Sequence, residues 1–208
     1  MKKKASFKNR VNNKWIRFCD GFLDIFVYRK KTRYYEQSNK EDYLTDVVST
    51  PYCVVRKVFK HVKKQNTSFV DVGCGSGRVI CWVAKKGLFK SYFGIEINKK
   101  AYSLALQNTY KSKNTSVLND DAFAINLDSF DCFYMWKPMK KEKWIEFIEK
   151  IPISISKKQL ILVNDFDVFE YMSNNKQWRM VLRKSFKSIY GVKIDSFKTM
   201  YSIWETSI

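Results

Sequence analysis

Histidine is almost missing from this sequence, and the few cysteines are not arranged in pairs. The chain has a single histidine, and its five cysteines form no C-x-x-C motif. This argues against a metal site, and in particular zinc, and against Ser-His-Asp or Cys-His catalysis. An odd number of scattered cysteines is typical of reduced thiols, so we expect a cytoplasmic protein. No apolar run approaches the ~18 residues that span a bilayer, and no signal-peptide core follows the basic N-terminus.

Acidic residues are also few. The 208 residues include 39 Lys and Arg against 20 Asp and Glu, a formal net charge of +19. Such an excess attracts polyanions, which include RNA, anionic lipid and acidic substrates. The alternative is a solvated, lysine-covered surface, because the charge is spread along the chain. The 45% hydrophobic content predicts a packed globular protein.

Residues 1–42 are predicted to form a basic N-terminal helical extension. Apolar residues recur there at steps of three and four, the spacing of one helix face: Val11, Trp15, Phe18, Phe22, Ile25 and Phe26. We expect this face to pack on the domain and cover part of its site. Alternatively, residues 1–28 lie on an anionic membrane or bind a polyanion. The mixture of charge and rings in RKKTRYY, residues 29–35, is a weak nucleic-acid signal.

Residues 43–208 alternate between helical and strand patterns and are predicted to form one domain. Helices are predicted over 43–64, with Pro51 as a candidate break, 77–86, 99–111 and 140–150, with further helical residues within 166–184. Strands are predicted over 68–72, 92–98, 115–118, 131–136 and 159–164. Two β-rich stretches, 185–197 and 198–206, predict a closing antiparallel pair. This alternation favours an α/β fold with a mostly parallel sheet covered on both faces.

A glycine-rich turn follows the first predicted strand of this domain. Gly73, Gly75 and Gly77 sit at every second position in FVDVGCGSGRVI, residues 69–80, and a helical pattern begins at once. Glycines let backbone N–H groups approach a cofactor closely. A dinucleotide fingerprint would need its third glycine at position 78, which is Arg78. The spacing therefore fits S-adenosylmethionine, which has no pyrophosphate, better than NAD.

Four segments carry a resemblance to a known family. They are VDVGCGSG at 70–77, Glu96 after the second strand, the DDA stretch at 120–122, and DCFYMWKPM at 131–139. In this order the chain resembles the class I S-adenosylmethionine-dependent methyltransferases, and most closely a small bacterial type with a G-C-G-x-G-R loop. The resemblance implies a Rossmann-like sandwich whose mostly parallel seven-stranded sheet has an antiparallel last strand.

The resemblance also implies which residues hold the cofactor, S-adenosyl-L-methionine. Asp71 would face its amino group or hold the turn, and Glu96 would accept both ribose hydroxyls. Asp121 would accept from the adenine amino group, supported by the N–H of Ala122. Taken alone, Asp120 and Asp121 could instead cap the following helix. The loop glycines complete the expected cofactor site: Gly73, Gly75 and Gly77.

The expected acceptor side is less defined. Thr50 and Tyr52 are candidate cofactor or substrate contacts, although a turn with a helix N-cap also explains this segment. Tyr134, Trp136 and Lys137 are the candidate substrate residues. Lys137 replaces the Asn or Asp that precedes proline in related enzymes. A charged lysine cannot accept a hydrogen bond from an amino base, so it would hold a phosphate or carboxylate, or remain solvated.

Arg78 is expected to be a surface charge at a helix N-terminus or to contact the cofactor carboxylate or an acidic substrate. No catalytic base stands out. The predicted function is methyl transfer to an anionic or macromolecular acceptor, with RNA favoured. The alternatives are a small metabolite, a lipid headgroup or a protein lysine, or a non-catalytic basic nucleic-acid-binding module on the same fold.

Overall fold

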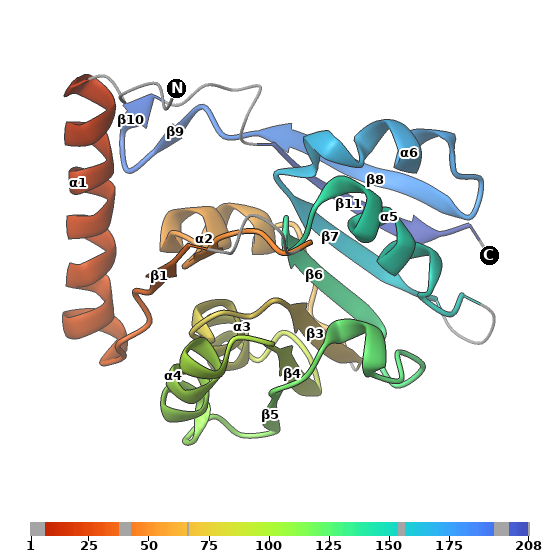
Figure 1. Cartoon of the computed structure of the whole chain (residues 1–208), viewed down its shortest axis with the longest axis horizontal. Helices are drawn as coiled ribbons and strands as arrows, with labels where there is room; N and C mark the ends of the chain where they lie inside the picture. Colours follow the sequence, from red (N-terminus) through yellow and green to blue (C-terminus); the bar gives the residue numbers. More distant parts are fainter. Residues whose placement is uncertain (1–6, 38–42, 66, 154–156, 194–199, 208) are drawn as a thin grey trace.

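The core of the protein is a seven-stranded sheet, seen here in a computed structural model that describes residues 7–37, 43–65, 67–153, 157–193 and 200–207 (Figure 1). Its strands lie in the order β5-β4-β3-β6-β7-β11-β8. Their bounds are β3 Ser68–Val72, β4 Ser91–Ile95, β5 Thr115–Leu118, β6 Cys132–Trp136, β7 Gln159–Val163, β8 Trp178–Ser185 and β11 Met200–Thr206. The strands from β5 to β7 pair in parallel, whereas β11 is antiparallel to both β7 and β8. The predicted fold, including the reversed last strand, is confirmed.

Helices cover both faces of this sheet, as Figure 1 shows. They are α2 Tyr52–Phe59, α3 Arg78–Lys86, α4 Lys99–Thr109, α5 Lys141–Glu149 and α6 Phe169–Asn174, with short 3-10 turns η2 Ala122–Ala124 and η3 Asp165–Asp167. Side chains alternate between the faces along each strand. In β7, Ile161 packs with α2 and α3, whereas Leu160 and Leu162 pack with α5 and α6. The two apolar clusters hold the strands in register, so that their carboxyl ends meet at one edge.

The segment before α2 differs from the prediction. Helix α2 begins only at Tyr52, and residues 43–50 are extended instead of helical. In this segment β2 Val47–Val48 pairs with β1 Tyr35–Glu36, and Leu44 pairs with Met139. The reason is local: Pro51 disfavours helical geometry at the preceding residue, and β-branched Val47 and Val48 favour a strand. The extended segment lies along the edge of the sheet where the site forms.

The closing β structure is also rearranged. The partners of β11 are β7 and β8. Strand β8 falls almost entirely within residues 166–184, which were predicted to include helix, and α6 in the same segment confirms helical residues there. The stretch expected to pair with β11 instead forms its own hairpin from β9 Ser188–Ile189 and β10 Val192–Lys193. Its end, residues 194–197, lies outside the described residues. Gly191, with φ +79°, makes the tight turn that closes this hairpin.

The N-terminal region is helical, as predicted, with α1 Phe7–Phe22 continuing into a π-helical turn, η1 Leu23–Tyr28. Its orientation is opposite to the expected one. The face of Phe18, Phe22 and Phe26 points to solvent, and the other face, which includes Asp20 and Asp24, is buried. The side chain of Val11 lies outside the described ones. The predicted boundary at residue 42 also lies outside the described residues and stays a prediction.

Candidate cofactor site

The glycine loop turns sharply at the carboxyl end of β3. Gly73, Gly75 and Gly77 have φ values of +73°, +55° and +78°, in the left-handed region that glycine enters without strain. A Cβ on Gly73 would lie 3.0 Å from Cβ of Pro138. The N–H of Gly73 donates to the carbonyl of Ile95 at 2.9 Å, which fixes the loop against β4.

A cavity of about 230 Å³ opens beside this loop. Its floor is made by the loop and by the strand ends that carry Asp71, Glu96 and Tyr134, and its opposite wall by the extended segment 43–50. The other predicted site residues in its lining are Thr50, Gly73, Gly75, Asp121, Ala122 and Trp136. All four motif segments therefore meet in one cavity, although they are spread over residues 70–139.

Asp71 is the most unusual group in the cavity. Its side chain is buried, and its Oδ2 has no hydrogen-bond partner among the described residues. Burial raises the pKa of Asp71 well above its usual value, and the neighbouring Glu96 carboxylate raises the pKa further. An ionised, unpartnered carboxylate in this position is unfavourable until a donor or a cation arrives. The residue therefore fits a cationic, hydrogen-bond-donating ligand.

Glu96 lies across the loop from Asp71, just after β4. Its Oε2 accepts from the N–H of Gly75 at 2.7 Å, and its Oε1 accepts from the N–H of Asn98 at 2.8 Å. Burial raises the pKa of Glu96, and these N–H groups oppose the increase by stabilising the charge. Each carboxylate oxygen keeps a second acceptor site. Glu96 thus braces the loop and still offers acceptors to the cavity.

Asp121 is engaged on both oxygens. Its Oδ1 accepts from the N–H of Phe123 at 2.9 Å and caps η2, which is the alternative that the sequence left open. Its Oδ2 accepts from the hydroxyl of Tyr43 at 2.6 Å. Ala122 lies beside it in the cavity lining. Tyr43 was not singled out from the sequence, because only the fold brings it to Asp121 from 78 positions away.

Of the remaining candidates, Thr50 lines the cavity and Tyr52 does not. The prediction for Tyr52 needs a correction, because its ring is buried against Tyr28 and its hydroxyl donates to Asp24 at 2.7 Å. Gly77 also stands outside the lining. Its role is close packing, since a Cβ there would lie 3.3 Å from Ala105.

The candidate substrate residues separate into two groups. Tyr134 and Trp136 line the cavity, and burial raises the pKa of Tyr134 strongly, so this phenol stays neutral near pH 7. Lys137 lies outside the cavity, in an adjoining groove that also contains Lys140, Lys141 and Trp136. Its Nζ lies 2.5 Å from a carboxylate oxygen of Asp167. Lys137 is therefore neither freely solvated nor inside the cavity.

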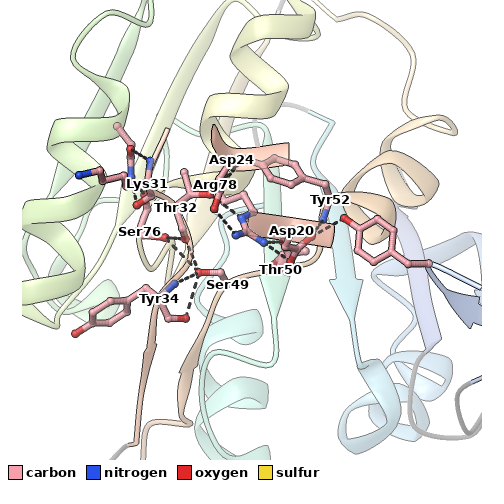
Figure 2. Close-up of polar contacts among 12 residues, drawn as sticks. Asp20, Asp24, Lys31, Thr32, Tyr34, Ser49, Thr50, Tyr52, Ser76 and Arg78 are labelled. Atoms are coloured by element: carbon pink, nitrogen blue, oxygen red, sulfur yellow. Dashed lines mark hydrogen bonds and ion pairs between the residues drawn. The ribbon is translucent and has the colours of Figure 1, made fainter. Parts of the chain in front are cut away.

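Arg78 is not a surface charge, and although it belongs to the cavity lining, its guanidinium is engaged by two acids of the N-terminal region. Its side chain is 2% exposed and forms ion pairs with Asp20 at 2.6 Å and Asp24 at 3.0 Å. Figure 2 shows the guanidinium between these carboxylates, where it also donates to the hydroxyl of Thr32 and the carbonyl of Thr50. The first residue of α3 thus anchors the N-terminal region to the glycine loop.

Two further residues link the N-terminal region to the loop. The hydroxyl of Ser76, in the loop, donates to the carbonyl of Thr32, and the hydroxyl of Ser49, after β2, donates to the same carbonyl (Figure 2). Sequence reasoning missed this contact and the roles of Asp20 and Asp24. The available signal was their spacing of four, which placed two acids on one side of an otherwise basic helix.

The sheet order and the position of this cavity are those of the Rossmann-like methyltransferase fold. Residues 69–152 match the family model described as a methyltransferase domain. A protein-lysine N-methyltransferase of Saccharolobus islandicus is 34% identical over 84 residues, which cover 38% of this chain and 52% of that protein. The chain thus spans about half the length of this curated relative.

Solved structures share the fold at low identity. A putative RNA methyltransferase from Pyrococcus horikoshii has a TM-score of 0.61 and 16% identity, covering 90% of this chain and 99% of that one. An RNA methyltransferase from Salinibacter ruber, in complex with S-adenosyl-L-homocysteine, has a TM-score of 0.55 and 16% identity, covering 76% and 93%. The expected Rossmann-like methyltransferase fold is confirmed, and the domain matched over residues 69–152 is similar to the expected family.

No helix among the described residues combines the length and apolarity needed to cross a membrane.

Proposed function

We propose that this chain transfers a methyl group from S-adenosyl-L-methionine to an anionic macromolecule, with RNA as the leading acceptor. The observation that carries the proposal is the pair of buried carboxylates, Asp71 and Glu96, beside a glycine loop at the carboxyl ends of adjacent parallel strands. Ligands of open α/β sheets bind at this edge. The matched methyltransferase domain supports the same donor.

The charge of the site suits this donor. S-adenosylmethionine supplies a sulfonium methyl group that is already activated for displacement, and it carries an ammonium group. Asp71 has an unpartnered acceptor oxygen and a raised pKa, so a cationic donor would relieve its burial cost. Glu96 would offer its remaining acceptor sites to hydroxyl groups, and Ala122 its backbone to the base. Asp121 would orient this corner through Tyr43 instead of contributing a free carboxylate.

The acceptor would enter along the groove that adjoins the cavity. This groove shares Thr45 and Trp136 with the cavity and carries three lysines and two acids: Lys137, Lys140, Lys141, Asp46 and Asp167. Phosphates attract such a cluster of lysines, and Trp136 offers a ring on which a base can stack. Positioning of the acceptor is the main contribution expected from the protein, since the donor is already reactive. The RNA methyltransferases of the same fold are consistent with this acceptor.

A protein lysine is the second candidate acceptor. It is favoured by one observation, the sequence identity of 34% to a protein-lysine N-methyltransferase. A lysine must lose a proton before it attacks, which requires a general base or a path for the proton. Tyr134 stays neutral and Asp167 is paired with Lys137, so neither is assigned this role.

The donor is tested first by calorimetry with S-adenosylmethionine. We expect Asp71→Ala and Glu96→Ala to weaken binding at least tenfold, because each removes a cavity acceptor. Glu142→Ala is the matched control, since Glu142 is an exposed carboxylate in the first turn of α5. No binding by the unaltered chain, or equal loss in the control, would refute the proposed donor.

The acceptor is tested by transfer of a tritiated methyl group to separate RNA, protein, lipid and metabolite pools. We expect label in RNA, with an affinity that falls steeply with salt. Lys140→Glu with Lys141→Glu should weaken RNA binding and reduce the salt slope by about 2. Lys60→Glu with Lys63→Glu, two exposed lysines outside the groove, is the control. If the label appears in protein alone, RNA is refuted as the acceptor and a protein lysine takes its place.

A further inference from the structure

The outward face of α1–η1 carries an unusual concentration of exposed apolar side chains. Five large ones lie within twelve residues at helical spacing, and their exposed fractions are Trp15 50%, Phe18 63%, Phe22 51%, Ile25 62% and Phe26 68%. The rings of Trp15 and Phe18 stack with their centroids 5.8 Å apart, and the ring centroids of Phe22 and Phe26 are 4.8 Å apart. Contiguous exposed apolar surface of this kind marks an interaction site. We call these five residues the aromatic face.

The orientation of this face is fixed by the other side of the helix. There Asp20 and Asp24 pair with Arg78, and Ile16 and Leu23 pack against the core. The indole N–H of Trp15 donates to the carbonyl of Tyr190, which ties the helix to the turn between β9 and β10. Figure 1 shows α1 standing along the outer side of the molecule. Turning the aromatic face inward would break a buried ion-pair cluster, so the face stays outward.

Basic side chains border the aromatic face on one side. Lys14 and Arg17 are exposed, and with Gly21 they form the next row of the helix surface. The guanidinium of Arg33 reaches this row, since its Nη1 lies 3.4 Å from the position of a Cβ on Gly21. The two acids of this segment, Asp20 and Asp24, are buried on the opposite side and are both paired with Arg78. The exposed surface thus combines an apolar face with an unopposed positive edge.

We propose that α1–η1 docks this protein on an anionic lipid surface, with the aromatic face in the boundary between headgroups and acyl chains and the basic edge on the headgroups. An amphipathic helix with large apolar side chains and a cationic border binds in this way. Trp and Phe suit such a boundary, where one side is apolar and the other wet.

Two other occupants fit the observations less well. A second copy of the chain would bring a second net charge of +19 to the same place, and the basic edges would repel. Single-stranded RNA would stack bases on free rings. Here the rings already pack on one another, and Ile25 adds an aliphatic surface that no base stacks on. The proposal does not depend on methyl transfer.

The test is flotation of the full chain with vesicles of phosphatidylcholine alone or with about a third phosphatidylglycerol. We expect binding to the anionic vesicles, and a loss of at least tenfold in the variant Phe18→Ser, Phe22→Ser, Phe26→Ser. Lys14→Glu with Arg17→Glu should also weaken it, and more at low salt than at high salt. The control is Tyr110→Ser, Met180→Ser, Val181→Ser, which removes three exposed apolar side chains from other surfaces.

A spectroscopic measurement on the unaltered chain removes any dependence on how the variants fold. Trp15 is half exposed, and anionic vesicles should shift its fluorescence to the blue and protect it from acrylamide. Trp15→Phe should abolish that change while vesicle binding is retained. The proposal is overturned if anionic vesicles do not bind, if the aromatic-face variant loses RNA binding and keeps vesicle binding, or if it only converts a dimer to a monomer.

Discussion

The substitution Arg78→Met tests how the N-terminal region is held. Arg78 is 2% exposed and donates to Asp20, Asp24, Thr32 and the carbonyl of Thr50. Its removal leaves two buried carboxylates without a counter-charge. Breaking a buried ion pair in this way costs about 3–5 kcal/mol. For a chain of this size that loss lowers Tm by about 6–20 °C.

The assay is thermal unfolding by circular dichroism, with Arg179→Met as the matched control. Nη2 of Arg179 lies 3.5 Å from Oε2 of Glu205 at the surface, and the side chain of Arg179 is 67% exposed. Its loss should cost less than about 1 kcal/mol. Hydrogen exchange adds a local readout, since residues 20–36 should lose protection in Arg78→Met. Limited proteolysis at Lys30 and Lys31 should then become faster.

A rescue variant separates charge from packing. Adding Asp20→Asn and Asp24→Asn to Arg78→Met removes the stranded charges, and it should recover a substantial part of the lost stability. The reasoning is refuted if Arg78→Met changes Tm no more than Arg179→Met. It is also refuted if the two amide substitutions lower the stability of Arg78→Met further.

Two further predictions concern the buried carboxylate of Asp71 and the close packing of Gly94 in β4. Asp71→Asn should stabilise the ligand-free protein at neutral pH by about 1 kcal/mol or more while weakening cofactor binding. Because the folded pKa of Asp71 is raised, the stability linked to its protonation is present at acid pH and lost as pH rises toward that pKa. The gain in free energy of unfolding from Asp71→Asn should therefore grow with pH. A gain that is the same at all pH values would contradict the prediction. Gly94→Ala should cost about 1–3 kcal/mol, since its Cβ would lie 2.4 Å from Cδ1 of Ile80 and 2.8 Å from Sγ of Cys74. Ile80→Val removes the clashing Cδ1, so adding it to Gly94→Ala should restore part of the free energy of unfolding measured in urea. If nothing is restored, the clash is refuted.

The sequence predicted the sheet well because parallel strands leave strong local signals. Buried apolar runs such as 69–72 and 159–163, with helical patterns between them, indicated both the strands and their parallel arrangement. The glycine spacing and Glu96 pointed to the edge of the sheet where the cavity lies. The helix predicted over 43–64 is confirmed from Tyr52 to Phe59, after the candidate break at Pro51. Its first part was wrong, because the β-branched residues before Pro51 favour a strand.

Other features depend on contacts between distant residues and leave no local pattern. Arg78 pairs with residues 54 and 58 positions away. The periodicity of α1 correctly identified an apolar face but not its direction, because burial of that face is only the usual outcome. The ion pairs of Asp20 and Asp24 with buried Arg78 turn the opposite face of the helix inward. The role of Tyr43 at Asp121 likewise becomes visible only when the extended segment is placed across the cavity.

The position of Arg78 has a consequence for how this protein can be divided. The family match begins at residue 69, and it includes Arg78 but neither of its acidic partners. A chain trimmed to the matched region would therefore lose both counter-charges of this guanidinium. The segment that sequence comparison recognises is thus shorter than the segment that holds Arg78 and the glycine loop together. A piece of this protein that keeps the buried ion-pair cluster must reach back at least to Asp20.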